Sequence, residues 1–122
     1  MEKVEKKIQQ PLDTSKVVGY LDDIALNALK AKNKIKFAHE VITEDEDGVK
    51  HATYFKKPEL KHLELLASYA KKDEPFEGLE ILFNTCRISG SEEVCTDDEM
   101  RSAAYQDLAL IFQKRETIVK KR

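Results

Sequence analysis

The sequence predicts a single α+β domain with an N-terminal helix, one antiparallel β-hairpin and a three-helix C-terminal bundle. Two changes of hydrophobic period indicate this order. Helical spacing before residue 32 gives way to strict alternation, and helical spacing returns after residue 58. The length of 122 residues suits one ordinary domain and is too short for two. We therefore expect residues 13–122 to form one unit behind a flexible arm of residues 1–12.

Composition and charge exclude several classes of protein. Charged residues make up 36% of the chain, and 21 Lys plus Arg against 23 Asp plus Glu leave a net charge of −2. This balance argues against a general nucleic-acid-binding protein, because it offers no excess of positive charge to phosphates. The apolar runs are too short to span a membrane, and no apolar signal core follows the basic start. We therefore expect no membrane partner and no export.

The first predicted helix covers residues 15–32. Any residue of Asp13-Thr14-Ser15 can cap its N-terminus, and Lys30 and Lys32 stand at its C-terminal end, where positive charge is favoured. The apolar positions have the spacing of an amphipathic helix: Val17, Val18, Leu21, Ile24, Ala25, Ala28 and Leu29.

An alternating pattern then predicts a β-hairpin over residues 34–56. Gly48, between the two alternating runs, can adopt the positive φ that a hairpin turn requires. In this pairing His39 and His51 are candidate cross-strand neighbours. An isolated hairpin is only marginally stable, so it must pack on a helix, add strands or pair with another molecule.

Two helices are predicted after the hairpin, over residues 58–71 and 75–88. Pro58 and Pro75 suit first helical turns, where the missing amide hydrogen of proline costs nothing. Gly90 supplies a stop for the second of these helices.

The last predicted helix covers residues 97–120, because Thr96 and Glu99 have the spacing of a capping box. A helix of this length cannot lie wholly over so small a core, so we expect its final turns to project and to meet a partner. The expected partner-binding residues are its apolar and basic side chains: Phe112, Arg115, Ile118, Val119, Lys120 and Lys121.

The expected core combines apolar positions from every predicted element. These are Leu21, Ala25, Phe37, Phe55, Leu63, Leu66, Leu79, Leu82, Phe83, Ala104, Leu108 and Ile111.

The sequence predicts no metal site. An EF-hand template laid over the acidic residues 44–47 fails at its first and last positions, Thr43 and Tyr54. The acidic residues between 92 and 99 are largely explained by helix capping. Cys86 and Cys95 lack the close spacing of zinc ligands, and we expect reduced thiols of a cytoplasmic protein.

Catalysis is also not expected, and no catalytic or cofactor-binding residue is predicted. A nucleophile needs a base within hydrogen-bond reach, and Cys86 falls on an apolar helical face where a thiol is inert. The four glycines form no phosphate-binding loop, nucleophile elbow or dinucleotide fingerprint.

From residue 54 onward, several short runs together resemble a known group of proteins. The runs are Tyr54-Phe55-Lys56-Lys57-Pro58, Pro75 through Cys86, Ile88 through Glu93, and Thr96 through Glu99. They resemble small proteins of tailed bacteriophages and prophages of the tail-assembly-chaperone type, over about residues 54–122. The resemblance implies a non-enzymatic assembly protein whose partners are phage structural proteins, the tape-measure or tail-tube protein, in the host bacterial cytoplasm.

Two other functions remain open at this point. The chain is alternatively a structural or packaged component of the virion, or a small nucleic-acid-binding regulator that uses its basic C-terminal helix. The sequence also leaves homo-oligomerisation and the identity of the partner open.

Overall fold

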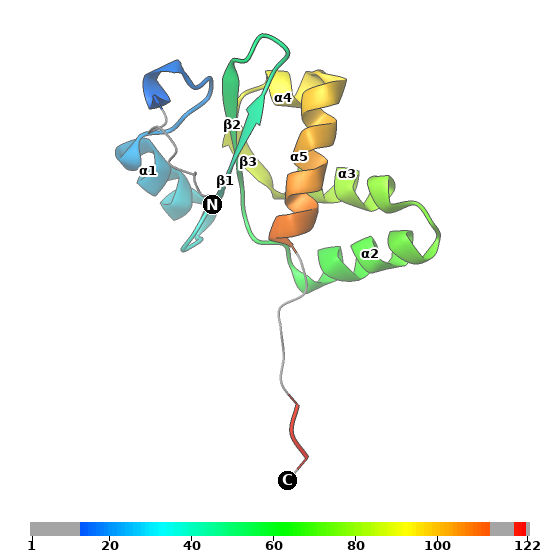
Figure 1. Cartoon of the computed structure of the whole chain (residues 1–122). Helices are drawn as coiled ribbons and strands as arrows, with labels where there is room; N and C mark the ends of the chain where they lie inside the picture. Colours follow the sequence, from blue (N-terminus) through cyan, green and yellow to red (C-terminus); the bar gives the residue numbers. More distant parts are fainter. Residues whose placement is uncertain (1–12, 113–118, 122) are drawn as a thin grey trace, which may run out of the picture.

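A three-stranded antiparallel sheet with strand order β1-β2-β3 forms the centre of the fold (Figure 1). The computed structural model describes residues 13–112 and 119–121. Its strands are β1 (His39–Glu44), β2 (Lys50–Phe55) and β3 (Arg87–Gly90). Its helices are η1 (Thr14–Lys16, a 3₁₀ turn), α1 (Asp23–Asn33), α2 (Leu60–Lys71), α3 (Pro75–Cys86), α4 (Glu93–Thr96) and α5 (Asp98–Ile111). The α+β class is the one that the sequence predicts, and the predicted flexible arm lies outside the described residues.

Strands β1 and β2 pair across a turn at Gly48, whose φ is 81°. The Asp45 side chain shapes this turn, because its Oδ1 accepts hydrogen bonds from the backbone N–H groups of Asp47 and Val49, both at 2.9 Å. The register places Thr43 opposite His51 and Phe55 opposite His39. The expected pairing of His39 with His51 is therefore wrong.

The third strand is absent from the sequence prediction. The expected helix over 75–88 ends at Cys86, and the chain turns directly into β3, which pairs with β2. Gly90 lies at the end of this strand with a φ of 126° and does not stop a helix. A Cβ at Gly90 would lie 2.5 Å from the Ala52 carbonyl oxygen, so only glycine permits this approach of β3 to β2.

The N-terminal segment completes the same edge of β2. The Val18 N–H donates to the Lys50 carbonyl at 2.9 Å, and the Ala52 N–H donates to the Val18 carbonyl at 2.8 Å. Helix α1 begins only after this extended stretch, where Asp22 caps it by accepting from the Ala25 N–H. The predicted start of this helix at residue 15 is therefore wrong.

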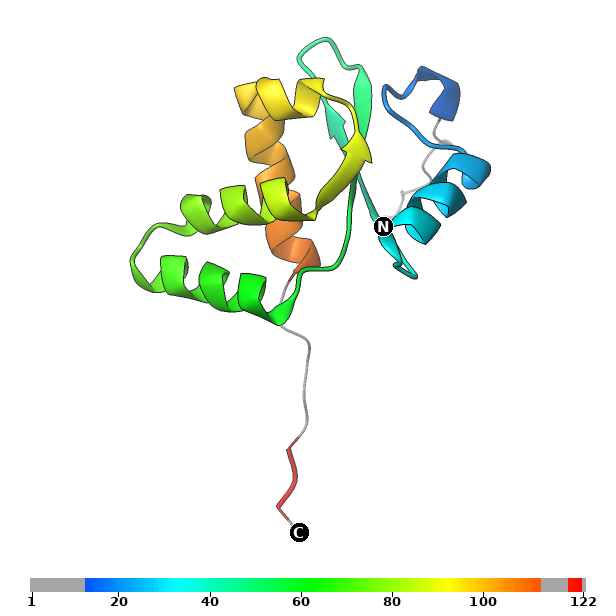
Figure 2. The same ribbon diagram turned by 180° about the vertical axis from the view of Figure 1, so that it is seen from behind.

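Strand β2 is buried on both faces, so the molecule has three layers (Figure 2). On one face Phe55 packs with Val41 against side chains of α3, α4 and α5: Leu79, Leu82, Phe83, Cys86, Val94, Met100, Ala104, Tyr105 and Leu108. On the other face Ala52 and Tyr54 pack against the N-terminal segment through Val17, Tyr20, Leu21, Leu26 and Leu29.

The Tyr54 side chain connects the N-terminal segment to the sheet through a hydrogen bond and through packing of its ring. Its hydroxyl donates to Glu40 Oε1 at 2.8 Å and accepts from the Leu21 N–H at 3.0 Å, while its ring is fully buried. Burial raises the pKa of this hydroxyl above its usual value, the Leu21 N–H opposes that rise, and the Glu40 carboxylate adds to it.

Half of the predicted core is buried. Phe55, Leu79, Leu82, Phe83, Ala104 and Leu108 are buried, while Leu21, Leu66 and Ile111 are half-buried. Ala25, Phe37 and Leu63 are exposed, so these three predictions are wrong. Phe37 lies outside the sheet, in the stretch before β1, and α1 and α2 contain no buried residue.

The helix starts differ in detail from those predicted. Pro75 is the first residue of α3, as expected, but α2 begins at Leu60, behind a reciprocal capping box between Glu59 and His62. Asp97, and not Thr96, caps α5, because its side chain accepts from the Met100 N–H at 3.0 Å. Thr96 instead ends the short helix α4.

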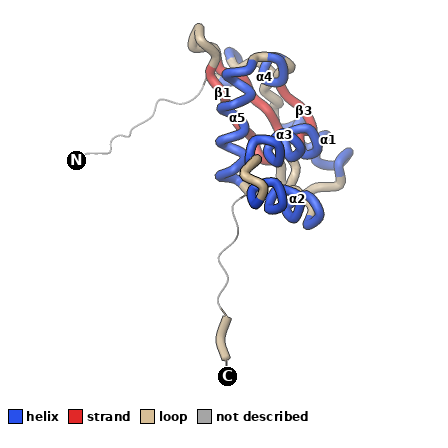
Figure 3. Tube along the Cα trace, turned by 90° about the vertical axis from the view of Figure 1, so that its right-hand side faces the viewer, coloured by secondary structure: helices blue, strands red, loops and turns tan. Residues whose placement is uncertain are grey.

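The predicted helix over 97–120 is too long. Helix α5 ends at Ile111, Phe112 forms its C-cap, and residues 119–121 are not helical. Figure 3 shows α5 running beside the sheet, with α2 at the far end of the helical layer. The longest described helix has 14 residues, and the described part of the chain contains no helix suited by length and apolar character to membrane crossing.

We predict that Gly90→Ala lowers the free energy of unfolding by more than about 3 kcal/mol, because it combines positive-φ strain with a backbone overlap. Gly48→Ala is the control: its φ is also positive, but nothing lies within 4 Å of a Cβ there, so we expect a loss of about 1 kcal/mol. Urea denaturation measures both. Equal losses would contradict the close approach of β3 to β2.

A second prediction concerns alkaline stability. A group whose folded pKa is raised stabilises the fold below its unfolded pKa, and the contribution is lost as pH rises toward the folded pKa. Tyr54→Phe should be less stable than the native chain at pH 8 by about 1 kcal/mol, through loss of its hydrogen bonds. This difference in the free energy of unfolding should become smaller at pH 11. The Tyr54 hydroxyl ionises there in the unfolded native chain but stays neutral in the fold, so the native chain loses stability that Tyr54→Phe, which lacks the hydroxyl, does not lose. A gap in urea stability that stays constant from pH 8 to pH 11 would contradict this.

Candidate functional site

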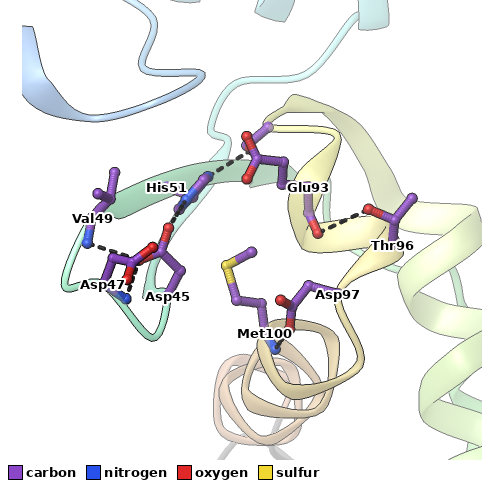
Figure 4. Close-up of polar contacts among 9 residues, drawn as sticks. Asp45, Asp47, Val49, His51, Glu93, Thr96, Asp97 and Met100 are labelled. Carbon is purple, nitrogen blue, oxygen red and sulfur yellow. Dashed lines mark hydrogen bonds and ion pairs between the residues drawn. The ribbon is translucent and has the colours of Figure 1, made fainter.

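A chain of hydrogen bonds joins Asp45, His51 and Ser91 across the sheet. His51 Nε2 lies 3.0 Å from Asp45 Oδ2, and His51 Nδ1 lies 2.8 Å from Ser91 Oγ. The His51 side chain is 1% exposed and that of Asp45 is 16% exposed. Figure 4 shows the Asp45 side chain from the hairpin turn and the Glu93 side chain from α4 lying near the His51 ring.

Three separate pieces of local structure position these side chains. The hairpin turn fixes Asp45 through backbone hydrogen bonds to its Oδ1, which leaves Oδ2 for His51. His51 stands in β2 on the face covered by the helices, the face that Phe55 shares by strand alternation. Ser91 follows β3, where its N–H donates to the Ala52 carbonyl at 2.9 Å.

The electrostatics of the cluster favour an ionised Asp45. The hydrogen bond from His51 is the main cause that lowers the pKa of the Asp45 carboxyl, with help from the Val49 and Asp47 N–H groups and against the effect of burial. A carboxylate only accepts, so His51 Nε2 carries the hydrogen of that bond. In a neutral ring, Nδ1 then accepts the hydroxyl hydrogen of Ser91.

Serine, histidine and aspartate are also the residue types of a hydrolytic triad. The geometry here does not expose the nucleophile, because Ser91 is 3% exposed and its N–H is bonded to Ala52. Two surface hollows lie elsewhere, and neither contains Ser91 or His51. One is lined by Asp13, Lys16, Val17, Gly48, Val49 and Lys50, and the other by Asp98, Glu99, Ser102, Ala103 and Gln106. The hydrogen-bonded chain therefore connects the hairpin turn, β2 and the residue that follows β3.

The same region brings together three groups that can bind a metal ion. Asp45, His51 and Glu93 each offer one ligand atom, and these atoms lie within 4.8 Å of one another. Residues 44–47 and 92–99 are two separate acidic groups in the sequence, and the fold places one carboxylate of each beside the buried His51. No local sequence pattern predicts this group of three, because Glu93 lies far along the chain from Asp45 and His51.

Both cysteines are free thiols. Cys86 is fully buried in the core, and burial raises the pKa of its thiol. This agrees with the inert thiol that the sequence predicts at this position.

Four of the predicted partner-binding residues lie in the described part of the chain, and these four do not lie on a helix. Phe112 is half-buried, and its ring packs edge-on against His39 with centroids 6.1 Å apart. Arg115 and Ile118 lie outside the described residues. Val119, Lys120 and Lys121 are exposed and non-helical.

A different apolar surface lies on α2 and the start of α3. Leu60 is 72% exposed and Phe76 is 59% exposed, with Leu63 and Leu65 at 37% each. We refer to these four side chains as the α2–α3 surface. Helix α2 buries no residue fully, because it contacts mainly α3, where Leu66 and Tyr69 close around Gly78. This surface is not predicted from the sequence, because the helical spacing of Leu63 and Leu66 predicts that both lie in the core.

Comparisons with protein-family models, with curated proteins and with solved structures find no match to this chain.

We predict that Ser91→Ala lowers the free energy of unfolding by about 1–3 kcal/mol, because it leaves the buried His51 Nδ1 without a partner. Ser102→Ala, on the exposed surface of α5, is the control and should change stability by no more than about 0.5 kcal/mol. Chemical denaturation of the two variants makes the comparison. Equal effects would mean that Ser91 is not needed to satisfy His51.

Proposed function

We propose that the chain is a non-enzymatic bacteriophage assembly protein, a tail assembly chaperone that shields tape-measure or tail-tube protein before polymerisation. The resemblance of residues 54–122 to proteins of that type suggests the class of partner. The observation that carries the proposal is the α2–α3 surface, which leaves large apolar side chains in water.

The energetics of this surface favour a protein partner. Burying an exposed side chain such as Leu60 or Phe76 gains roughly 1.5–3 kcal/mol, and the described chain leaves both largely uncovered. Leu60 begins α2 and Phe76 lies beyond its end, at the start of α3, so a partner that covers both side chains must extend along the helix pair. A tape-measure or tube subunit must hide apolar helices or strand edges until it assembles, and an amphipathic helix can pack on such a surface.

The arrangement of α2 also suits reversible binding. Helix α2 has no fully buried residue and meets the core that Phe55 and Phe83 share through the half-buried Leu66, so a partner can cover its exposed side without rearranging the sheet. A chaperone must release its client at polymerisation, which a modest apolar contact permits more readily than a large buried interface.

The proposal is tested by co-expressing the chain with the tape-measure and tail-tube proteins of the genome that encodes it. We expect one of them to co-purify with the native chain, and Phe76→Asp to weaken that complex at least tenfold, which corresponds to about 1.4 kcal/mol. Calorimetry on the purified proteins measures the change, and circular dichroism checks that the variant is folded.

Ile24→Asp is the matched control, because Ile24 is 82% exposed on α1, on the other side of the sheet. It should bind as the native chain does. Loss of binding in Ile24→Asp with normal binding in Phe76→Asp would move the interface to α1. Absence of a complex with either client protein would overturn the chaperone proposal.

The two alternative functions give different results in the same system. A structural or packaged component would be found by mass spectrometry in purified virions at a fixed copy number, whereas a chaperone is absent from them. A nucleic-acid-binding regulator would use the exposed Lys120 and Lys121, and its affinity would fall steeply with salt.

A further inference from the structure

We propose that Asp45, His51 and Glu93 form a binding site for a divalent transition-metal ion, with Zn²⁺ as the first candidate. The inference does not depend on the proposed chaperone function. It concerns the opposite end of the helical layer from the α2–α3 surface (Figure 1).

The donor set and its spacing fit such an ion. One imidazole nitrogen and two carboxylate oxygens lie within 4.8 Å of one another. Ligand atoms around tetrahedral zinc are about 3.3 Å apart, given bond lengths near 2.0 Å. The 3.0 Å separation of His51 Nε2 and Asp45 Oδ2 is already close to this value. An imidazole ligand favours transition metals over calcium and magnesium.

The partner of the other ring nitrogen supports the same conclusion. A metal-bound histidine usually donates its second N–H to an oxygen that fixes the ring, and Ser91 Oγ lies 2.8 Å from Nδ1. A hydroxyl both donates and accepts, so Ser91 can partner either tautomer of His51. When the metal binds, the Nε2 hydrogen leaves to solvent and Nδ1 takes one up, so a neutral ring stays neutral and Nε2 gains the free lone pair.

Two buried hydroxyls on the same face of the sheet also lack protein partners within the described chain. Thr43 is the cross-strand neighbour of His51 and Thr53 lies two residues after His51 in β2, and neither hydroxyl has a hydrogen-bond partner among the described residues. A bound water or ion is one explanation for buried polar groups left without a protein partner.

The site is also reachable from solvent. His51 itself is buried, but Asp45 is partly exposed and Glu93 is exposed at the start of α4. The two carboxylates therefore link the buried His51 ring to the surface, with Glu93 approaching it from α4 and Asp45 from the hairpin turn (Figure 4).

The test titrates Zn²⁺ into the full-length, tag-free chain with its thiols kept reduced, by calorimetry and by thermal melting. We expect saturable binding of one ion per chain and a rise in melting temperature. Glu93→Gln should weaken binding at least tenfold and abolish most of that rise, and its exposed position means that the variant should fold. Glu92→Gln is the matched control, because the Glu92 side chain is next to Glu93 in the sequence but is 85% exposed and lies outside the cluster. This variant should bind Zn²⁺ as the native chain does.

Co²⁺ then reports the type of ligand. Visible absorption of a tetrahedral site without a thiolate-to-cobalt band in the near ultraviolet is expected for nitrogen and oxygen donors. A thiolate band that Cys95→Ser removes would place the ion at that cysteine and overturn the proposal. Equal weakening by Glu92→Gln and Glu93→Gln, or no saturable binding, would also overturn it.

Discussion

Burial of β2 on both of its faces is the constraint on which the other elements depend. Phe55 requires the helical layer, and its ring packs edge-on against Phe83, with centroids 5.5 Å apart. Tyr54 requires the N-terminal segment, whose Leu21 N–H donates a hydrogen bond to the Tyr54 hydroxyl. In the same segment, the backbone of Val18 is hydrogen-bonded to the edge of β2. An isolated β1–β2 hairpin would leave one or both of these aromatic rings in water, so a third strand and a cover on each face are needed before the strand is stable.

The helical layer is held in place by one cation as well as by apolar packing. The Arg101 guanidinium stacks over Phe83 at 4.4 Å, and it donates to the Tyr105 hydroxyl, to the Cys95 carbonyl and to Asn84. These contacts join α3, α4 and α5 around the same aromatic ring that meets Phe55. The position of α4, and with it that of Glu93, therefore follows from the packing that buries β2. Within the carboxylate–histidine cluster, the core therefore positions Glu93, while the hairpin turn positions Asp45.

Short-range sequence patterns predict the features that depend on neighbouring residues alone, which are turns, helix starts and part of the core. The Gly48 turn, the Pro75 helix start and six core residues follow from turn chemistry and periodicity. Strand β3 was missed because four residues ending in glycine carry no period of their own and pair only with a partner some 35 residues earlier. Phe37 was assigned to the core because alternation does not say where a strand begins. The His51 cluster joins segments 40 residues apart, which spacing alone cannot reveal.

Strand β2, which is covered on both faces, also separates parts of the molecule that differ in how much side chain they bury. Helix α1 has no buried residue, and the segment before it is held by the Tyr54 face and by two hydrogen bonds between Val18 and the edge of β2, so α1 has fewer contacts to lose than the helical layer that packs on Phe55. This difference would be seen as fast amide hydrogen exchange in α1 beside slow exchange in β2's partners α3 and α5. Strand β2 thus separates a helical layer rich in buried side chains from an N-terminal cover whose helix has none.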